Sequence, residues 1–320
     1  MKFSYKLRQA GILVAVFCTT LLTNCKKDDE ATPQTVTDVV VADNRFSFLE
    51  AAVIRAGLAD VLRTTNNITV FAPTDDAFKA AGFADVAAVN AATVATLASI
   101  LQYHVLATRV ASTAIQTGDN AATPTLLTTN GNLFITKNAG GVSVNGARVT
   151  QADVSASNGV IHVIDRVLLP PAGNLLQVIQ ALNTANNNQY SLLIAAATRA
   201  GATVLNALST AAGPFTVFAP NNAAFTAAGF GTEAAINAAT PAALQAVLLN
   251  HVVGARVFST NLASGSVNAA GGGPLAIVVG TSGAVTVAGR GNSTATANVT
   301  RVNIVATNGV IHLIDRVLLP

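Results

Sequence analysis

The chain has 320 residues, and at roughly 100–200 residues per domain this length suggests two domains once a processed segment is removed. Charged residues make up only 10% of the sequence, against about 25% in an ordinary soluble domain, so the surface must be polar through Asn, Thr, Ser and Gln. With the three basic residues of the leader set aside, fifteen basic and fifteen acidic residues balance. A chain without basic excess and without tryptophan is poorly suited to neutralise phosphates and stack bases, so we expect no nucleic-acid partner.

Residues 1–24 have the anatomy of a secretory signal peptide. Three basic residues precede an apolar run over residues 10–22, which is too short and too asymmetric for a stable membrane span. The run ends in Leu-Thr-Asn-Cys, which resembles the lipobox of bacterial lipoproteins, where acyl chains such as palmitate are attached to the cysteine. We therefore predict that Cys25 is lipidated and becomes the first mature residue; the alternative is an ordinary signal peptide cleaved nearby.

Residues 25–34 are predicted to form a lipidated tether. Lys26 and Lys27 are followed by three acidic residues and then a proline, without apolar periodicity, which is typical of a solvated spacer. The same pattern directly after a lipid-bearing cysteine resembles the surface-export signal of Bacteroidetes-type lipoproteins. Several acyl chains on one cysteine suffice for stable anchoring, since each buried CH₂ contributes about 0.8 kcal/mol. We therefore expect a membrane contact through this anchor, with the domains at the surface of a bacterial outer membrane.

The rest of the chain consists of two copies of one sequence unit. Residues 67–78 recur at residues 214–225, and residues 158–170 return at residues 308–320 with a single change. The offset between the copies grows slightly along the chain, so the copies differ by small loop insertions and the period has the size of a domain. We expect two globular domains, at residues 35–170 and 172–320.

Helices are predicted in the first half of each copy. Ser47 with Glu50 three residues later has the form of a capping box, and Gly57 suits the left-handed position after a helix, so a helix is expected over about residues 48–56. The second copy starts the same helix at Ser191 without the acidic residue. Further predicted elements are strands at 68–71 and 215–218, short helices after them that end at Gly82 and Gly229, and longer helices from Thr93 to about His104 and from Thr240 onward.

Strands are predicted in the second half of each copy. The apolar period changes to two, and Asn145-Gly146 is a turn signal between two strands. Helices followed by strands, without regular alternation, indicate an α+β fold. In the first copy the expected strands cover residues 133–137, 142–144, 148–150 and 160–169.

The repeated boxes resemble the fasciclin, or FAS1, domain family. Thr-Val-Phe-Ala-Pro-x-x-x-Ala-Phe is similar to the first signature box of that family, and Asn-Gly-Val-Ile-His-x-Ile-Asp-x-Val-Leu-Leu-Pro to the second. Between them the family carries Tyr-His, present here as Tyr103-His104 and altered to Asn250-His251 in the second copy. The resemblance covers residues 35–320 and implies two tandem domains, each with a β-sandwich-like sheet and flanking short helices. It also implies extracellular adhesion and matrix contact without catalysis.

The sequence offers little that indicates catalysis or metal binding. All four histidines lie in the repeated segments, and the two in each copy are about sixty residues apart, without the close spacing of a zinc site. Cys18 belongs to the leader and Cys25 to the lipidation site, so the mature chain keeps no free thiol. We expect no metal, no cofactor and no catalytic residue. The Tyr103-His104 and Asn250-His251 segments are candidates for either receptor contact or buried hydrogen bonding.

These observations favour a surface-anchored adhesion or matrix-type binding protein that is not an enzyme. Its partner would be an extracellular or envelope protein, or a polysaccharide. The second copy carries only seven charged residues, which suits an uncharged polar partner such as a glycan. Two alternatives stay open: an accessory subunit that holds a polysaccharide or partner protein within the envelope, and a hydrolase with its pocket near His104 or His251.

Overall fold

The computed structural model describes residues 33–210, 213–292 and 295–320. The predicted leader and the predicted lipidation site at Cys25 lie outside the described residues. Residues Gln34–Pro320 form one compact unit. None of the helices in this described part is long and apolar enough to cross a membrane.

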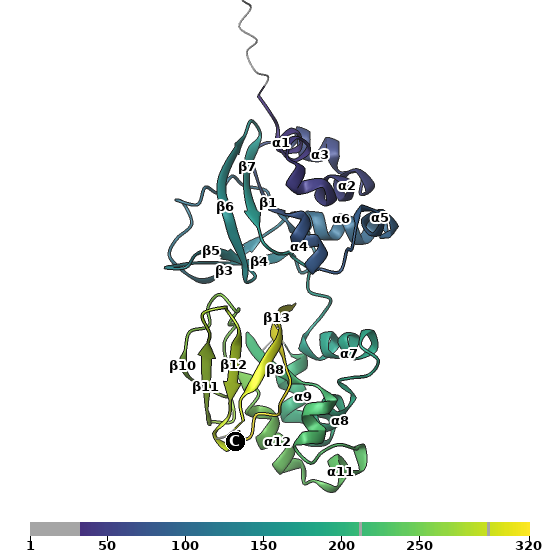
Figure 1. The fold of residues 1–320 in the computed structure, drawn as a ribbon, viewed down its shortest axis with the longest axis vertical. Helices are drawn as coiled ribbons and strands as arrows, with labels where there is room; N and C mark the ends of the chain where they lie inside the picture. Colours follow the sequence, from purple (N-terminus) through teal and green to yellow (C-terminus); the bar gives the residue numbers. More distant parts are fainter. Residues whose placement is uncertain (1–32, 211–212, 293–294) are drawn as a thin grey trace, which may run out of the picture. The chain divides into compact units, whose positions relative to one another are not determined.

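The first copy places short helices beside one seven-stranded sheet (Figure 1). Its helices are α1 (Val36–Ala42), the 3₁₀ turn η1 (Asn44–Phe46), α2 (Ser47–Arg55), α3 (Ala59–Thr64), α4 (Asp75–Ala80), α5 (Val86–Ala91) and α6 (Val94–Tyr103). Its strands are β1 (Ile68–Pro73), β2 (Val105–Leu106), β3 (Gly118–Pro124), β4 (Asn132–Asn138), β5 (Gly141–Val144), β6 (Ala147–Ala156) and β7 (Gly159–Ile164).

The second copy repeats this order of α-helices and strands, but its 3₁₀ turn lies between β12 and β13. Its helices are α7 (Leu175–Ala185), α8 (Ser191–Ala200), α9 (Ala202–Ser209), α10 (Asn222–Ala227), α11 (Glu233–Ala238), α12 (Pro241–Leu249) and the 3₁₀ turn η2 (Arg290–Asn292). Its strands are β8 (Phe215–Pro220), β9 (Val252–Val253), β10 (Gly265–Asn268), β11 (Pro274–Val279), β12 (Val285–Ala288), β13 (Ala297–Ala306) and β14 (Gly309–Ile314).

The two repeated boxes of each copy lie side by side in the sheet. The strand order is β2-β1-β7-β6-β5-β4-β3 in the first copy and β10-β11-β12-β13-β14-β8-β9 in the second. β1 and β7 run parallel, with Phe71 opposite His162, and β8 and β14 run parallel, with Phe218 opposite His312. The remaining strand pairs are antiparallel. The repetition of these boxes therefore reflects a shared pair of central strands.

Each sheet buries apolar side chains on both faces. In β1, Val70 and Ala72 belong to the cluster packed against the helices, whereas Phe71 belongs to a second cluster with residues of β4 and β5. This alternation follows from the two-residue period of a strand. Register shifts in β6, where Asp153 has a positive φ of 58°, bend the sheet around the second cluster. The predicted sandwich-like sheet is thus one bent sheet with a core on each face.

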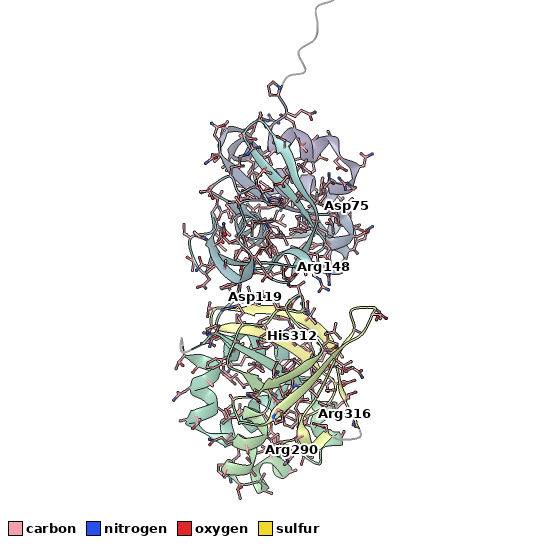
Figure 2. The ribbon with its side chains drawn as sticks, turned by 90° about the vertical axis from the view of Figure 1, so that its left-hand side faces the viewer. Asp75, Asp119, Arg148, Arg290, His312 and Arg316 are labelled. Carbon is pink, nitrogen blue, oxygen red and sulfur yellow. The ribbon has the colours of Figure 1, made fainter. Side chains whose placement is uncertain are left out.

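The predicted capping box at Ser47 is wrong. Ser47 is the first residue of α2, after the 3₁₀ turn, and its hydroxyl donates to Oδ2 of Asp75 at 2.7 Å. The Phe48 backbone N–H donates to Oδ1 of the same carboxylate at 3.0 Å, so the start of α2 is capped by the first residue of α4 (Figure 2 labels Asp75). A carboxylate brought near by the tertiary fold replaces the local Glu50. In the second copy Asn222 caps α8: its Oδ1 accepts from the Leu192 N–H at 3.0 Å, and its Nδ2 donates to the Ser191 hydroxyl at 3.0 Å.

Other element predictions are confirmed at their main positions. Thr93 caps α6, and Asn145-Gly146 forms the hairpin turn with φ of 49° and 76°. β7 ends at Ile164 and not at residue 169, because its parallel partner β1 ends opposite Ile164 and Asp165 turns to accept from the Arg148 N–H at 2.8 Å. The elements without a prediction are mainly the short helices α1, α3, α5, α7, α9 and α11 and the strands β2, β3, β9 and β10.

Candidate functional site

Tyr103 is the last residue of α6, and its side chain is fully buried. Its hydroxyl donates to the Asn132 carbonyl at 2.9 Å and accepts from Nδ2 of Asn145 at 2.9 Å. Burial raises the pKa of the phenol to about 12. The hydroxyl therefore connects the end of α6 to β4 and to the hairpin turn between β5 and β6, and it does not face solvent.

His104 follows as the C-cap of α6 and is also buried. Its Nδ1 donates to the Ile100 carbonyl at 2.7 Å, and its Nε2 accepts from the Leu168 backbone N–H at 2.9 Å. This arrangement requires the neutral ring, and burial lowers the pKa of His104 to about 4. His104 thus joins the last turn of α6 to the segment after β7.

The second copy keeps the hydrogen bonds of the histidine but has a different residue before it. Nδ1 of His251 donates to the Val247 carbonyl at 2.8 Å, and its Nε2 accepts from the Leu318 N–H at 2.8 Å. Burial lowers the pKa of His251 to about 4. Asn250 replaces the tyrosine, is buried, and donates from Nδ2 to the Leu318 carbonyl at 3.2 Å. The structure therefore places all four candidate residues, Tyr103, His104, Asn250 and His251, inside the two copies.

The two histidines in strands, His162 in β7 and His312 in β14, also link distant backbone segments by hydrogen bonds. Nε2 of His162 donates to the Val110 carbonyl at 2.8 Å, its Nδ1 accepts from the Asp153 N–H at 3.2 Å, and its ring stacks on Phe71 with centroids 5.6 Å apart. The cross-strand pairing of β1 and β7 creates this stack.

His312 in β14 is the counterpart of that histidine (Figure 2). Nε2 donates to the Val257 carbonyl at 2.9 Å, and the ring stacks on Phe218 at the same centroid separation of 5.6 Å. Its Nδ1 is buried and has no hydrogen-bond partner among the described residues. Burial lowers the pKa of His312 to about 4, so the ring is neutral at neutral pH.

This pattern opposes the hydrolase alternative at His104 and His251. A general base needs a ring nitrogen within reach of the nucleophile, whereas both nitrogens of each of these rings are occupied by backbone groups. Within the described residues, no three His, Cys, Asp or Glu side chains come together in a way that could hold a metal ion. The geometry of His104 and His251 therefore favours a structural role, in which each ring links two backbone segments, over a catalytic role.

Asn158, the first residue of the second box, is an organising residue that sequence reasoning did not single out. Its Oδ1 accepts from the Val36 N–H at 2.8 Å, and its Nδ2 donates to the Leu62 carbonyl at 2.7 Å and the Thr65 carbonyl at 2.9 Å. One buried amide thus holds the start of α1 and the end of α3. The repetition of Asn before Gly in both boxes was the available signal. In the second copy Asn308 makes the matching bonds to Leu175, Leu208 and Thr210.

Arg256 is a buried cation in the unit Gln34–Pro320. Its guanidinium donates to the carbonyls of Gly309 at 2.7 Å and Ala306 at 3.2 Å, and it lies 3.9 Å from the ring centroid of Phe134. Desolvation lowers the pKa of Arg256 to about 10. Carbonyl oxygens and an aromatic face satisfy the charge, and no carboxylate in the described residues pairs with it.

With this fold described, comparison with known proteins assigns the chain to a class. The family model of the Fasciclin domain matches residues 44–170 and 188–320, so the chain belongs to the fasciclin domain family. The predictions of the family and of an α+β fold with two tandem FAS1 domains are confirmed.

Several curated proteins are similar to one or both copies. Protein sll1483 of Synechocystis sp. is 41% identical over 146 residues, which are 43% of this chain and 74% of that protein. Transforming growth factor-beta-induced protein ig-h3 of Sus scrofa is 40% identical over 141 residues, 43% of this chain and 20% of that protein. Periostin of Homo sapiens is 35% identical over 190 residues, 59% of this chain and 21% of that protein.

A solved structure is also similar over most of the chain. It is a FAS1 domain pair from the insect cell adhesion molecule Fasciclin I, 20% identical, covering 85% of this chain and 96% of that one with a TM-score of 0.40.

Proposed function

We propose that this protein is a lipid-anchored envelope protein that presents two fasciclin domains for adhesion, binding an extracellular or envelope protein or a polysaccharide without transforming it. The observation that carries the proposal is the pair of fasciclin domains, since such domains are found in adhesion and extracellular-matrix proteins such as ig-h3 and periostin. The lipobox-like sequence before Cys25 supports the anchor, and the charged tether after it supports display on the outer face of a bacterial outer membrane.

The buried motif residues determine how such binding would work. Tyr103, His104, Asn250 and His251 have less than 3% of their surface exposed, so they support the binding surface from inside and do not contact the partner. Contact would then fall on exposed loops and helices. In the second copy these carry few charges and many Asn, Thr and Ser side chains, which suits the hydroxyl groups of a glycan.

The anchor and the location are tested together on intact cells. We expect external protease to degrade the protein, and expect labelled palmitate to be incorporated in the native chain and in the Cys18→Ser variant but not in Cys25→Ser. Cys18 is the matched control, since it is the only other cysteine. Full protection from protease, with labelling retained, would contradict surface display and favour the accessory subunit inside the envelope.

Binding is tested with a lipid-free chain that begins at Ala31 and so retains the compact unit Gln34–Pro320. We expect saturable binding to at least one member of a panel of glycans and matrix proteins. Loss of binding on substitution of exposed Asn and Thr residues in one copy would identify the copy that binds. Uniform absence of binding by a folded chain would contradict the adhesion proposal.

A further inference from the structure

An apolar cavity of about 160 Å³ lies in the first copy, between the helices α1, α2 and α3 and the end of α6. Its wall is made by aliphatic side chains from four helices and from β1. Those that carry the argument are Val40, Leu49, Val53, Leu62, Val70 and Leu101, all buried. Of the two repeated boxes, only Val70 and Phe71 of the first line this cavity.

The polar groups buried in this wall are already satisfied. The Thr37 hydroxyl donates to the Ala59 carbonyl at 3.4 Å, and both ring nitrogens of His104 are bonded to backbone groups. His104 leaves no free ring nitrogen, and the Thr37 hydroxyl leaves no free donor and only acceptor lone pairs, whereas a buried water needs two to four polar partners. A cavity of this kind stays dry, and a cavity of about 150 Å³ with aliphatic walls is large enough to bind benzene.

The mouth of the cavity is apolar as well. Val41 and Ile54 line it and are 51% and 65% exposed, so apolar surface meets solvent at this end of the cavity. Charged groups at the rim are Glu50 and Arg63, and Arg63 is 3.7 Å from the Asp38 carboxylate. The carboxylates of Glu50 and Asp38 outnumber the one guanidinium near the mouth, which disfavours an anionic ligand.

The second copy adds aliphatic side-chain volume at three of the matching positions. The hydrogen bonds of Asn158 and Asn308 align α1 with α7 and the end of α3 with the end of α9, so that Leu62 corresponds to Leu208. Thr37, Glu50 and Ala59 then correspond to Leu176, Ile194 and Leu205, which pack against the core of the second copy. Smaller residues replace three others of the lining: Ala197 stands for Val53, Thr198 for Ile54 and Ser209 for Arg63.

We propose that the first copy binds the end of an uncharged alkyl chain of about six carbons in this cavity, as presented by a long-chain alcohol or a neutral lipid. The volume of the cavity limits the length of the alkyl chain, and the hydrogen bonds already made by its buried polar groups favour an apolar ligand. The carboxylates at the rim exclude a ligand that carries a carboxylate at the mouth. This inference does not depend on the adhesion function proposed above.

The test is a titration of the lipid-free chain from Ala31 with 1-hexanol, followed by methyl NMR of the Val, Leu and Ile side chains. We expect saturable shifts of the methyl groups of Val40, Leu49 and Val53, and at least tenfold weaker binding of hexanoate and of 1,6-hexanediol. Shifts spread evenly over both copies, or shifts that do not saturate, would overturn the proposal.

Variants copied from the second copy provide the control. Ala59→Leu and, separately, Thr37→Leu should fill the cavity and weaken 1-hexanol binding at least tenfold while the rest of the methyl spectrum is retained. Ala95→Leu, on an exposed position of α6, should bind as the native chain does. If both filled variants fold and still bind 1-hexanol with native affinity, the cavity is not the site.

Discussion

At the scale of single residues, neutral histidines act as cross-links between distant backbone segments. His104 and His251 each join a helix end to the segment after the last strand of their copy. His312 joins β14 to the loop at Val257. Such a role needs one nitrogen as donor, and in the first two histidines the other as acceptor, so protonation would break a bond as well as bury a charge.

These buried histidines predict a loss of stability on mild acidification. The unfolded rings take up protons near pH 6.5, whereas the folded rings of His104, His251 and His312 stay neutral down to about pH 4. Between these values the unfolded chain binds more protons, so the free energy of unfolding should fall as the pH is lowered, by up to about 1.4 kcal/mol per pH unit for each ring. Urea denaturation at pH 7 and at intervals down to pH 4.5 measures this slope.

A matched variant distinguishes this cause from other acid effects. His251→Gln does not titrate, so its slope between pH 6.5 and 4.5 should be smaller than that of the native chain by about a third. An unfolding free energy that is the same at pH 7 and pH 5 would contradict the assignment of the three rings.

Tyr103 gives a prediction about the hydroxyl group alone. Tyr103→Phe leaves the Asn145 amide and the Asn132 carbonyl without their buried partner, so we expect a loss of about 1–3 kcal/mol in unfolding free energy. Tyr190→Phe is the control, because no hydrogen bond of the Tyr190 hydroxyl occurs in the described residues, and its effect should stay within about 0.5 kcal/mol. Equal losses for the two substitutions would mean that the hydrogen bonds of the Tyr103 hydroxyl add nothing to the free energy of unfolding.

At the scale of elements, helix ends are held by side chains that are distant in sequence. Asp75 at the start of α4 caps α2, and Asn158, just before β7, holds both α1 and α3. The short helices could not be stable alone, since isolated helices of this length are marginal in water. Polar side chains that are distant in sequence therefore determine where these helices begin and end.

The two candidate caps of α2 can be ranked by substitution. Asp75→Ala should lower the unfolding free energy by about 1–2 kcal/mol, because it removes the acceptor of the Phe48 N–H and of the Ser47 hydroxyl. Glu50→Ala should change it by less than about 0.5 kcal/mol. Thermal or urea unfolding of both variants measures the difference. A larger loss for Glu50→Ala than for Asp75→Ala would support the local capping box at Ser47 instead.

At the scale of the whole molecule, the two copies keep the same fold and diverge on their surfaces. The first copy carries ten acidic and eight basic residues, whereas the second carries two acidic and five basic ones. The apolar cavity at α1 to α3 adds a second difference, since Leu176, Ile194 and Leu205 bring larger aliphatic side chains to three matching positions in the second copy. Duplication has therefore retained the internal tethers and changed the surfaces available to partners.

This charge distribution predicts how adhesion responds to salt. Binding through the nearly uncharged second copy should change by less than about threefold between 50 mM and 500 mM NaCl, because few charges are available to be screened. The measurement is the affinity of the lipid-free chain for its partner across that range. A steep decrease with salt would place the contact on the more charged first copy.

The sequence by itself determined the duplication, the fasciclin family, the α+β class and the main helices and strands, because repeated boxes, caps and hairpin turns are local signals. It did not determine whether Tyr103 and His104 face a partner or the core, since burial depends on contacts with β4, β5 and the segment after β7. The capping of α2 by Asp75, the role of Asn158 and the cavity beside α1 likewise arise only in the tertiary structure. Each brings together side chains far apart in sequence, and hydrogen bonds and packing volume depend on distance in space and not on spacing along the chain.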